Sequence, residues 1–366
     1  MQRKNNLDWL IFFMKTKRIL LMSILWVMLG LCGCQSDTSV SVQSPTASDS
    51  SSSLTTPSLN APTTSTPASN EPSSDVSSEC HMMLNPYNTL SVPTQITKIG
   101  TDYFLVDCYH NQILTSTSLD KPLEEWYVVT DQINRGHTIA GNGHVYLADD
   151  TENHRILVFQ KEGAEFVQTQ VFENIGNRPH YVEYVPATER FYVLSSMSGE
   201  LYVFVQEDPF AEVRLEKILT IPNMQNVYIR SFTIDEDVIY FAASNGIILR
   251  TRLEDLELLE QWSLPDEIAG LVQMVKIGDY YYLTVSTDIN GNAESATIIR
   301  TKDLSYLQDH GYDELYETFN QTGTPYYISS FDGHYYLTHH CYLPGHGVWQ
   351  FDISEEELTN TIPLYP

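Results

Sequence analysis

The chain has 366 residues, of which 42% are hydrophobic and 18% are charged, and its formal net charge at pH 7 is −27. This length suits one large all-β domain or two small ones behind a leader segment. A surface this acidic repels the phosphates of nucleic acids and the headgroups of anionic lipids, so neither is expected as a recognised partner.

The N-terminal segment has the three parts of a secretory signal. A basic patch at residues 15–18 precedes an apolar run at 19–31, which is followed by small residues and a cysteine. The run is shorter than the ~20 residues of a membrane-spanning helix, so an uncleaved anchor is the less favoured alternative. The sequence Leu31-Cys32-Gly33-Cys34 resembles the lipobox of bacterial lipoproteins. The resemblance implies that residues 1–33 are a signal peptide and that lipidated Cys34 holds the protein on the outer face of the cell membrane.

Residues 34–79 are almost entirely Ser, Thr, Pro, Ala, Asn and Asp. Such a composition cannot bury enough surface to offset the entropy of ordering, so we expect a disordered tether. The folded domain is then expected over residues 80–366. Translation can start at Met1 or at Met14, which directly precedes the basic patch, and the sequence leaves this open.

One strand pattern returns six times in the expected domain, at intervals of 42 to 54 residues. Its copies begin at Tyr103, Val145, Phe191, Ile239, Tyr281 and Tyr335. Each is rich in aromatic and β-branched residues, as a half-buried strand requires. A second apolar run follows each copy, and in most repeats a shorter strand precedes the copy. Most repeats also end in a fourth, more polar strand, which in the fifth repeat is predicted at Leu315–Phe319.

Four strands repeated at this period, without amphipathic helices between them, predict an all-β fold. The prediction is a six-bladed β-propeller of four-stranded blades. A β-sandwich is the alternative, but it gives no reason for six similar periods. Closure of the ring requires the chain ends to complete the last blade, and either Thr89–Val92 or Thr361–Leu364 can supply the missing outer strand.

The second repeat carries a more specific signal. Its strand ends at Asp149 and is followed by Asn153, His154 and Arg155 and then by another apolar strand. This order resembles an NHL repeat, a family of propeller blades in which the polar trio mainly ties a blade together. The resemblance implies that these four residues are structural. The first repeat is a weaker match, and the other four keep only the rhythm of the strands.

Ligands of propellers usually meet the mouth of the central channel, where each blade contributes the start of its innermost strand. Counting back from each repeated strand places one polar residue per blade there: Gln95, His137, His180, Ser231, Gln273 and Tyr327. Arg135, Arg178 and Arg230 stand beside members of this set. We expect these nine residues to bind a small molecule, a glycan or a protein, with the arginines as donors to an anionic or sugar-like ligand.

Two histidines at one channel mouth also suggest a divalent metal. The alternative function is therefore a metal-dependent lyase or hydrolase with His137 and His180 as ligands. A catalytic zinc site usually has about three protein ligands, and no third His or carboxylate stands at the predicted positions. No nucleophile motif or phosphate-binding glycine loop stands out either. A non-catalytic binding protein with an unknown cofactor requirement is the leading interpretation, and a purely structural scaffold is a third.

Two smaller groups of residues leave alternatives open. Cys108 and Cys341 lie at corresponding strand ends in blades that ring closure makes neighbours, so a disulfide and two buried thiols are both expected ahead of a metal site. The segment from Asp288 to Asn292 resembles part of a calcium loop, but Asn-Gly between two strands is first a hairpin turn.

Overall fold

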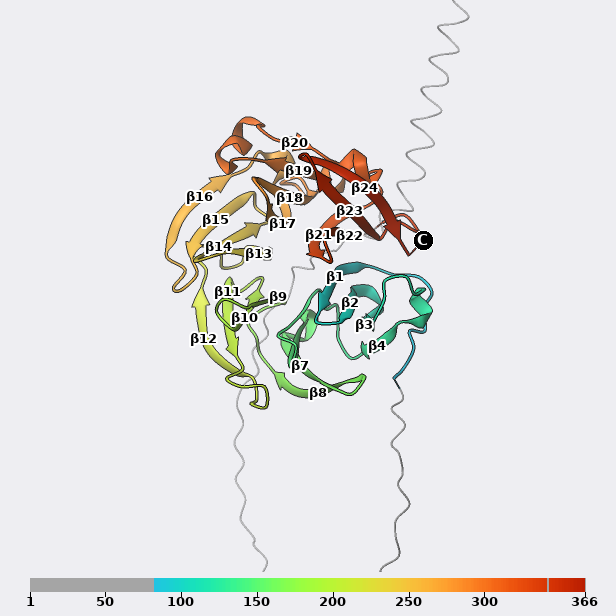
Figure 1. Ribbon diagram of the computed structural model, residues 1–366. Helices are drawn as coiled ribbons and strands as arrows, with labels where there is room; N and C mark the ends of the chain where they lie inside the picture. The colour runs from blue at the N-terminus through green and yellow to red at the C-terminus, as the bar shows by residue number, and fades with distance from the viewer. Residues whose placement is uncertain (1–81, 341, 366) are drawn as a thin grey trace, which may run out of the picture. The chain divides into compact units, whose positions relative to one another are not determined.

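The computed structural model describes residues 82–340 and 342–365. The predicted signal peptide, the predicted lipidation site Cys34, the predicted tether and Cys341 lie outside the described residues. Within them, strands β1 to β24 form six antiparallel sheets of four strands each. The sheets stand around a common centre as the blades of a propeller (Figure 1), which confirms the predicted fold. No helix in these two ranges is long and apolar enough to cross a membrane.

The first three blades follow the chain in order. Blade one contains β1 (Pro93–Ile99), β2 (Asp102–Asp107), β3 (Gln112–Ser116) and β4 (Tyr127–Thr130). Blade two contains β5 (Ile139–Gly141), β6 (Val145–Asp150), β7 (Arg155–Glu162) and β8 (Glu165–Phe172). Blade three contains β9 (Pro179–Val185), β10 (Arg190–Ser195), β11 (Glu200–Val205) and β12 (Arg214–Thr220).

The last three blades repeat this plan. Blade four contains β13 (Ile229–Asp235), β14 (Val238–Ala243), β15 (Ile247–Arg252) and β16 (Leu258–Ser263). Blade five contains β17 (Gly270–Ile277), β18 (Tyr280–Thr287), β19 (Thr297–Thr301) and β20 (Asp313–Glu314). Blade six contains β21 (Thr324–Phe331), β22 (His334–His340), β23 (Val348–Ser354) and β24 (Glu357–Leu364).

The outer strand of blade five differs from the prediction. The segment Leu315–Phe319 is not a strand, because Tyr316–Phe319 forms the 3-10 helix η7 and the short β20 takes the outer position. Tyr316 and Phe319 are three residues apart, so one 3-10 turn places both on the same side. Both are buried there in the hydrophobic cluster between blades five and six. A strand would have placed them on opposite faces.

The hydrophobic core is divided among the interfaces between neighbouring blades. Between blades one and two, for example, Phe104 and Val106 pack with Tyr146 and Ala148, and the rings of Phe104 and Tyr146 lie 5.5 Å apart. The second strand of each blade is buried on both faces, as in β6, where all six residues are buried. This explains why the repeated pattern reads as a continuous apolar run.

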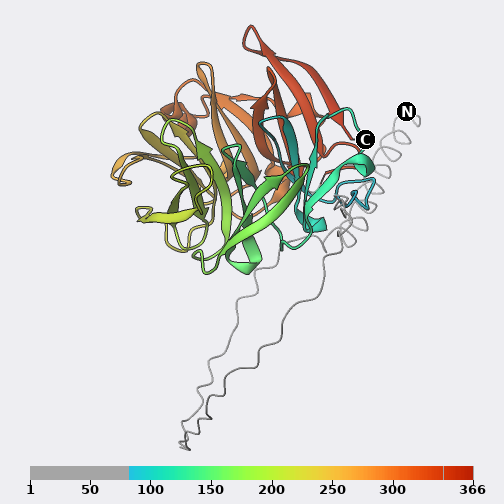
Figure 2. The same ribbon diagram turned by 60° about the horizontal axis from the view of Figure 1, so that its bottom comes forward.

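Each blade consists of consecutive strands, and the chain ends share no sheet. Of the two closure alternatives, Thr361–Leu364 is the one that supplies an outer strand, as the end of β24, whereas Thr89–Val92 precedes β1. In both views the last blade lies beside the first (Figures 1 and 2).

Side chains close the seam between blades six and one. The hydroxyl of Thr338 donates to the carbonyl oxygen of Thr94 over 2.7 Å. Lys98 Nζ lies 2.6 Å from a carboxylate oxygen of Asp332. The phenol of Tyr365 donates to the carbonyl of Leu119 over 3.1 Å. The seam is therefore built from the same kinds of contact as the other blade interfaces, without a shared strand.

Candidate functional site at the channel mouth

The strand pairing shows that the predicted mouth residues occupy two adjacent rings. Gln95, Ser231 and Gln273 pair with Val106, Ala242 and Thr284, which are equivalent positions of the second strands. Their equivalents in blades two and three are Thr138 and Tyr181, not the two histidines. The glutamine ring is therefore Gln95, Thr138, Tyr181, Ser231, Gln273 and Tyr327. The histidine ring, one residue closer to the mouth, is Thr94, His137, His180, Arg230, Val272 and Tyr326.

The predicted alignment was wrong by one residue in blade two for a simple reason. The strand β6 ends in two aspartates, and the prediction matched Asp149 to Asp107. In the structure Asp150 is the equivalent of Asp107, because both residues end the second strand opposite the first residue of the third strand. The similar sequence context of His137 and His180 then carried the same shift into blade three.

The glutamine ring holds neighbouring blades together. Gln273 accepts a hydrogen bond from the backbone nitrogen of Ile328 over 2.6 Å and donates to its carbonyl over 3.2 Å. Gln95 accepts from the backbone nitrogen of Ile139 over 2.8 Å, and Ser231 donates to the carbonyl of Val272 over 2.8 Å. Each partner belongs to the next blade. Three of the predicted ligand-binding side chains are thus engaged by backbone groups.

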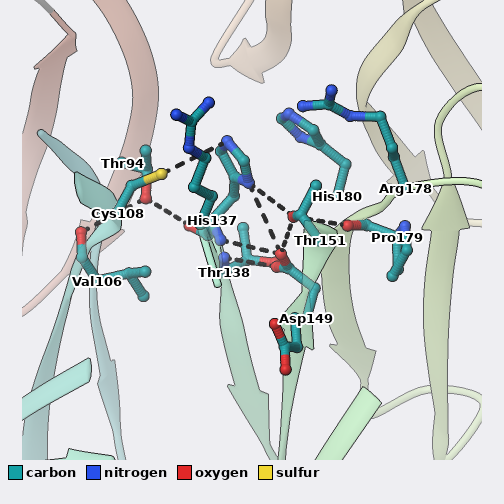
Figure 3. Close-up of polar contacts among 12 residues, drawn as sticks. Thr94, Val106, Cys108, His137, Thr138, Asp149, Thr151, Arg178, Pro179 and His180 are labelled. Carbon is teal, nitrogen blue, oxygen red and sulfur yellow. Dashed lines mark hydrogen bonds and ion pairs between the residues drawn. The ribbon is translucent and has the colours of Figure 1, made fainter. Parts of the chain in front are cut away.

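The histidine ring brings the two predicted histidines into direct contact. The imidazole rings of His137 and His180 are stacked, with centroids 3.8 Å apart and planes 22° apart (Figure 3). Both residues are buried. His137 Nδ1 lies 2.9 Å from the hydroxyl of Thr151, and the backbone nitrogen of His137 donates to Asp149 over 2.9 Å. The thiol of Cys108, which is free and buried, lies 3.9 Å from His137 Nε2.

Three tyrosine hydroxyls surround His180. Its Nε2 lies 2.8 Å from the hydroxyl of Tyr228 and 3.3 Å from that of Tyr326, and its Nδ1 lies 3.2 Å from that of Tyr327. Burial, followed by the proximity of His137 and the positive charges of Arg230 and Arg178, lowers the pKa of His180 well below its usual value. His180 is therefore neutral at neutral pH, with one ring nitrogen donating and the other accepting.

The predicted arginines gather at the same place. The guanidinium groups of Arg178 and Arg230 lie 5.7 and 5.0 Å from the centre of the Tyr228 ring. The Nε atoms of both arginines are buried and have no hydrogen-bond partner. Arg135 is exposed and lies 5.0 Å from the ring of Tyr109. These contacts form a cationic and aromatic surface above the stacked histidines.

His340 completes the cluster from blade six. Its ring lies 6.0 Å from that of Tyr326 and 5.5 Å from that of Tyr109. Burial, together with the positive charges of Arg230 and Arg135 and the neighbouring His137, lowers the pKa of His340 to about 4. His340, Tyr228 and Tyr326 were not among the predicted site residues. Tyr326 could have been found, because it directly precedes Tyr327.

The predicted metal ligands do not fit a metal site as they are placed. Stacked imidazoles do not direct their in-plane nitrogen lone pairs to one point, and three of the four ring nitrogens lie within hydrogen-bond distance of hydroxyl groups. Chelation by His137 and His180 would require at least one ring to turn and lose these contacts. In residues 82–340 and 342–365 no three His, Cys, Asp or Glu side chains gather as metal ligands.

The polar residues of the second blade have structural contacts. Asp150 accepts hydrogen bonds from the backbone nitrogen of Asn134, from Asn153 Nδ2 and from Arg155 Nε, over 2.7 to 3.0 Å. His154 Nδ1 accepts from the backbone nitrogen of Arg178 over 3.0 Å. The trio therefore ties blade two to the segments before blades two and three. Its carboxylate partner is Asp150, whereas buried Asp149 is bound by Thr138, Thr151 and the His137 backbone.

The segment from Asp288 to Asn292 closes on itself. The Asp288 carboxylate accepts hydrogen bonds from the backbone nitrogens of Asn290 and Asn292, each over 2.8 Å, and from Asn292 Nδ2 over 2.6 Å. These hydrogen bonds are those of a turn in the connection between β18 and β19, which fits the hairpin-turn alternative.

Comparison with known proteins supports the reading of the second blade. Residues 138–159 match the NHL repeat. This span covers β6 and the greater part of β7, where the sequence resemblance had been placed. No curated protein matches the sequence.

Two solved structures share the propeller architecture. Both are named "putative 6-phosphogluconolactonase". The protein from Bacteroides uniformis is 13% identical with a TM-score of 0.51, covering 72% of this chain and 83% of its own. That from Bacteroides fragilis is 13% identical with a TM-score of 0.54, covering 74% and 84%. At this identity the likeness concerns the fold alone.

Proposed function

We propose that this chain is an exported, lipid-anchored propeller that binds a small anionic molecule at the channel mouth without transforming it. The observation that carries the proposal is the position of Arg178 and Arg230 against one tyrosine ring, beside neutral His180. Guanidinium groups are planar donors whose geometry matches carboxylates and phosphates.

The charge distribution supports an anionic ligand. Arg178 pairs with Glu152 over 3.1 Å, but Arg135 and Arg230 form no ion pair with any residue that the structure describes. Arg230 donates instead to the hydroxyl of Ser286 over 2.6 Å. On a chain with a net charge of −27, unpaired guanidinium groups at the mouth would give a local site of opposite sign.

Neutral groups around the arginines would complete the recognition of a ligand. Burial raises the pKa of Tyr326 and Tyr327 well above the usual value, so both keep their protons. The hydroxyl of Tyr327 already donates to the carbonyl oxygen of Arg230 over 2.7 Å, so the hydroxyls left for ligand oxygen atoms are those of Tyr228 and Tyr326, which share His180 Nε2. Both nitrogens of His180 are already engaged by tyrosine hydroxyls, so His180 has no unengaged nitrogen to act as a general base, which favours binding over catalysis at this residue.

Calorimetric titration of the full chain with citrate and pyrophosphate tests the binding proposal. We expect saturable binding that the Arg178→Gln, Arg230→Gln double variant weakens at least tenfold, because two charge-assisted contacts are lost. Arg214→Gln is the matched control, since Arg214 is exposed on β12 and pairs with Glu207. Absence of saturable binding, or equal affinity in the double variant, would overturn the proposal.

The proposed membrane anchor is supported by the lipobox-like sequence that ends at Cys34, and it is tested separately from ligand binding. In the native bacterium we expect the protein in the membrane fraction and its Cys34→Ala variant outside that fraction or unprocessed. Mass spectrometry of the mature N-terminus is expected to show a diacyl or triacyl group on Cys34. An unmodified N-terminus upstream of residue 34 would refute the anchor.

A further inference from the structure

The opposite face of the propeller has a cavity that the mouth does not explain. It lies between blades four and five and has a volume of about 650 Å³. Asp235, the last residue of β13, lines this cavity, whereas Arg230 of the channel mouth lies near the start of the same strand. The cavity and the mouth are therefore at opposite ends of β13. The volume falls within the ~300–1,000 Å³ of small-molecule sites.

One wall of this cavity is aromatic. Tyr240 of β14, Trp262 of β16 and Tyr281 of β18 all line it. The rings of Tyr240 and Trp262 are 22° from parallel with centroids 6.4 Å apart, and Tyr281 lies 6.1 Å from Tyr240. Trp262 and Tyr281 are only half-buried, so part of each ring surface is open to the cavity. Such surfaces bind the apolar face of a ligand ring.

The other wall consists of charges that are already paired. Lys276 Nζ lies 2.8 Å from Asp235, and Arg250 Nη1 lies 3.0 Å from Glu260. Lys302 Nζ, also in the lining, lies 3.1 Å from Glu356. Paired charges place donors and acceptors side by side, which matches hydroxyl groups, because each hydroxyl both donates and accepts. An ionic ligand would have to compete with these pairs.

Two further observations define the ligand. The Arg250 side chain is 33% exposed and donates to Glu260 through Nη1, so the rest of its guanidinium group can donate to a ligand oxygen. The additional carboxylates Glu236, Asp237 and Asp303 also line the cavity and make it unfavourable for anions. A ligand with many hydroxyl groups and no net charge satisfies both conditions.

A second cavity of about 520 Å³ lies next to the first, between blades three and four, and the two together form a groove. It shares Glu236 and Asp237 with the first and has similar chemistry, with Tyr192 in the lining. Arg190 there is bound to Glu216 over 2.6 and 2.9 Å. Because the two cavities meet at the turn between β13 and β14, a ligand made of several sugar units could extend along both.

We propose that the groove beside Tyr240, Trp262 and Tyr281 binds a neutral oligosaccharide, with sugar rings against the aromatic wall and hydroxyls on Arg250 and Glu260. This site is separate from the channel mouth and does not depend on the function proposed there.

The test uses the full chain and a panel of four neutral tetrasaccharides, the β-1,4-linked tetramers of glucose, mannose and N-acetylglucosamine and the α-1,4-linked tetramer of glucose. The β-1,4-linked tetramers of glucosamine and glucuronic acid serve as cationic and anionic counterparts. We expect at least one neutral tetramer to bind saturably by calorimetry, and the anionic tetramer to bind at least tenfold more weakly. The proposal would be overturned if no neutral tetramer binds, or if a charged tetramer binds more strongly than every neutral one.

Variants locate the binding. We expect Trp262→Ala to weaken it at least tenfold, while Phe210→Ala leaves it unchanged, since Phe210 is 95% exposed and outside both cavities. Tyr281→Ala provides a second reading if Trp262→Ala does not fold. The Arg178→Gln, Arg230→Gln variant is expected to keep the oligosaccharide affinity, which separates this site from the mouth. Unchanged affinity in both cavity variants would refute the assignment.

Discussion

A single glutamate on the innermost strands allows a quantitative test of the structure. Glu183 lies on β9, two residues beyond the glutamine ring, and is half-buried. At the equivalent positions the other blades carry small uncharged residues, namely Thr97, Ala140, Thr233, Val275 and Ser329. Burial without a compensating cation raises the pKa of Glu183 from its usual 4.5 to about 8.

The sign of the effect follows from proton linkage. Between pH 4.5 and 8 the unfolded chain has released the proton of Glu183, whereas the folded chain still holds it, so stability falls as pH rises through this window. At ~1.4 kcal/mol per pH unit the upper limit is about 5 kcal/mol. Because Glu183 is only half-buried, water screens its charge, and we expect about 2 kcal/mol of the free energy of unfolding to be lost.

Urea unfolding of the full chain, followed by tryptophan fluorescence at pH 5, 6, 7 and 8, measures this loss. Glu183→Gln keeps the shape of the side chain and removes its ionisation. Its free energy of unfolding should therefore exceed that of the wild type increasingly as pH rises, while the two proteins agree best at pH 5. Parallel curves across the four pH values would show that the carboxylate is solvated as in water and that the reasoning from burial is wrong.

Three further predictions concern stability, each measured by urea unfolding. Asp150→Asn should cost about 2–3 kcal/mol because buried Asp150 holds Arg155 and Asn153, whereas the control Glu173→Gln changes only an exposed pair and should cost less than 0.5 kcal/mol. Gln273→Met should cost about 2 kcal/mol because it leaves the backbone nitrogen and carbonyl of Ile328 unpaired. The control is Gln261→Met at an exposed position, and equal stability of the two variants would contradict the role of Gln273 in linking blades five and six. Burial lowers the pKa of His339 to about 3, so as pH falls below 6.5 the unfolded chain binds a proton at this residue before the folded chain does, and the wild type loses stability. The His339→Phe variant should lose less of its free energy of unfolding over the same pH range. Identical acid profiles of the two proteins would refute this prediction.

The sequence was sufficient for the blades because the interfaces repeat. Each second strand is buried between two neighbouring blades, so the same aromatic and β-branched pattern recurs at each interface and can be counted. The register within a blade is less well determined. Where Asp149 and Asp150 stand together, the sequence does not say which one ends the strand, and a shift of one residue moved the histidines into the wrong ring.

The remainder of the mouth cluster could not be predicted from spacing. His180 contacts Tyr228, Tyr326 and Tyr327, which are 48 to 147 residues away along the chain. Their proximity depends on the closure of the ring and on which side chains reach across it. Local patterns identify residues that start an innermost strand, but they do not indicate which of these residues meet at the centre.

The self-contained blades have a consequence for how such a domain can change. Since no sheet combines strands from both chain ends, a cut between two blades with a new link between the present ends would preserve all strand pairing. Circular permutants opened before β5 or before β17 should therefore remain foldable. For the same reason, duplication or deletion of one complete blade in the gene would leave every other sheet intact. Only the fit between adjacent blade faces would then hold the number at six.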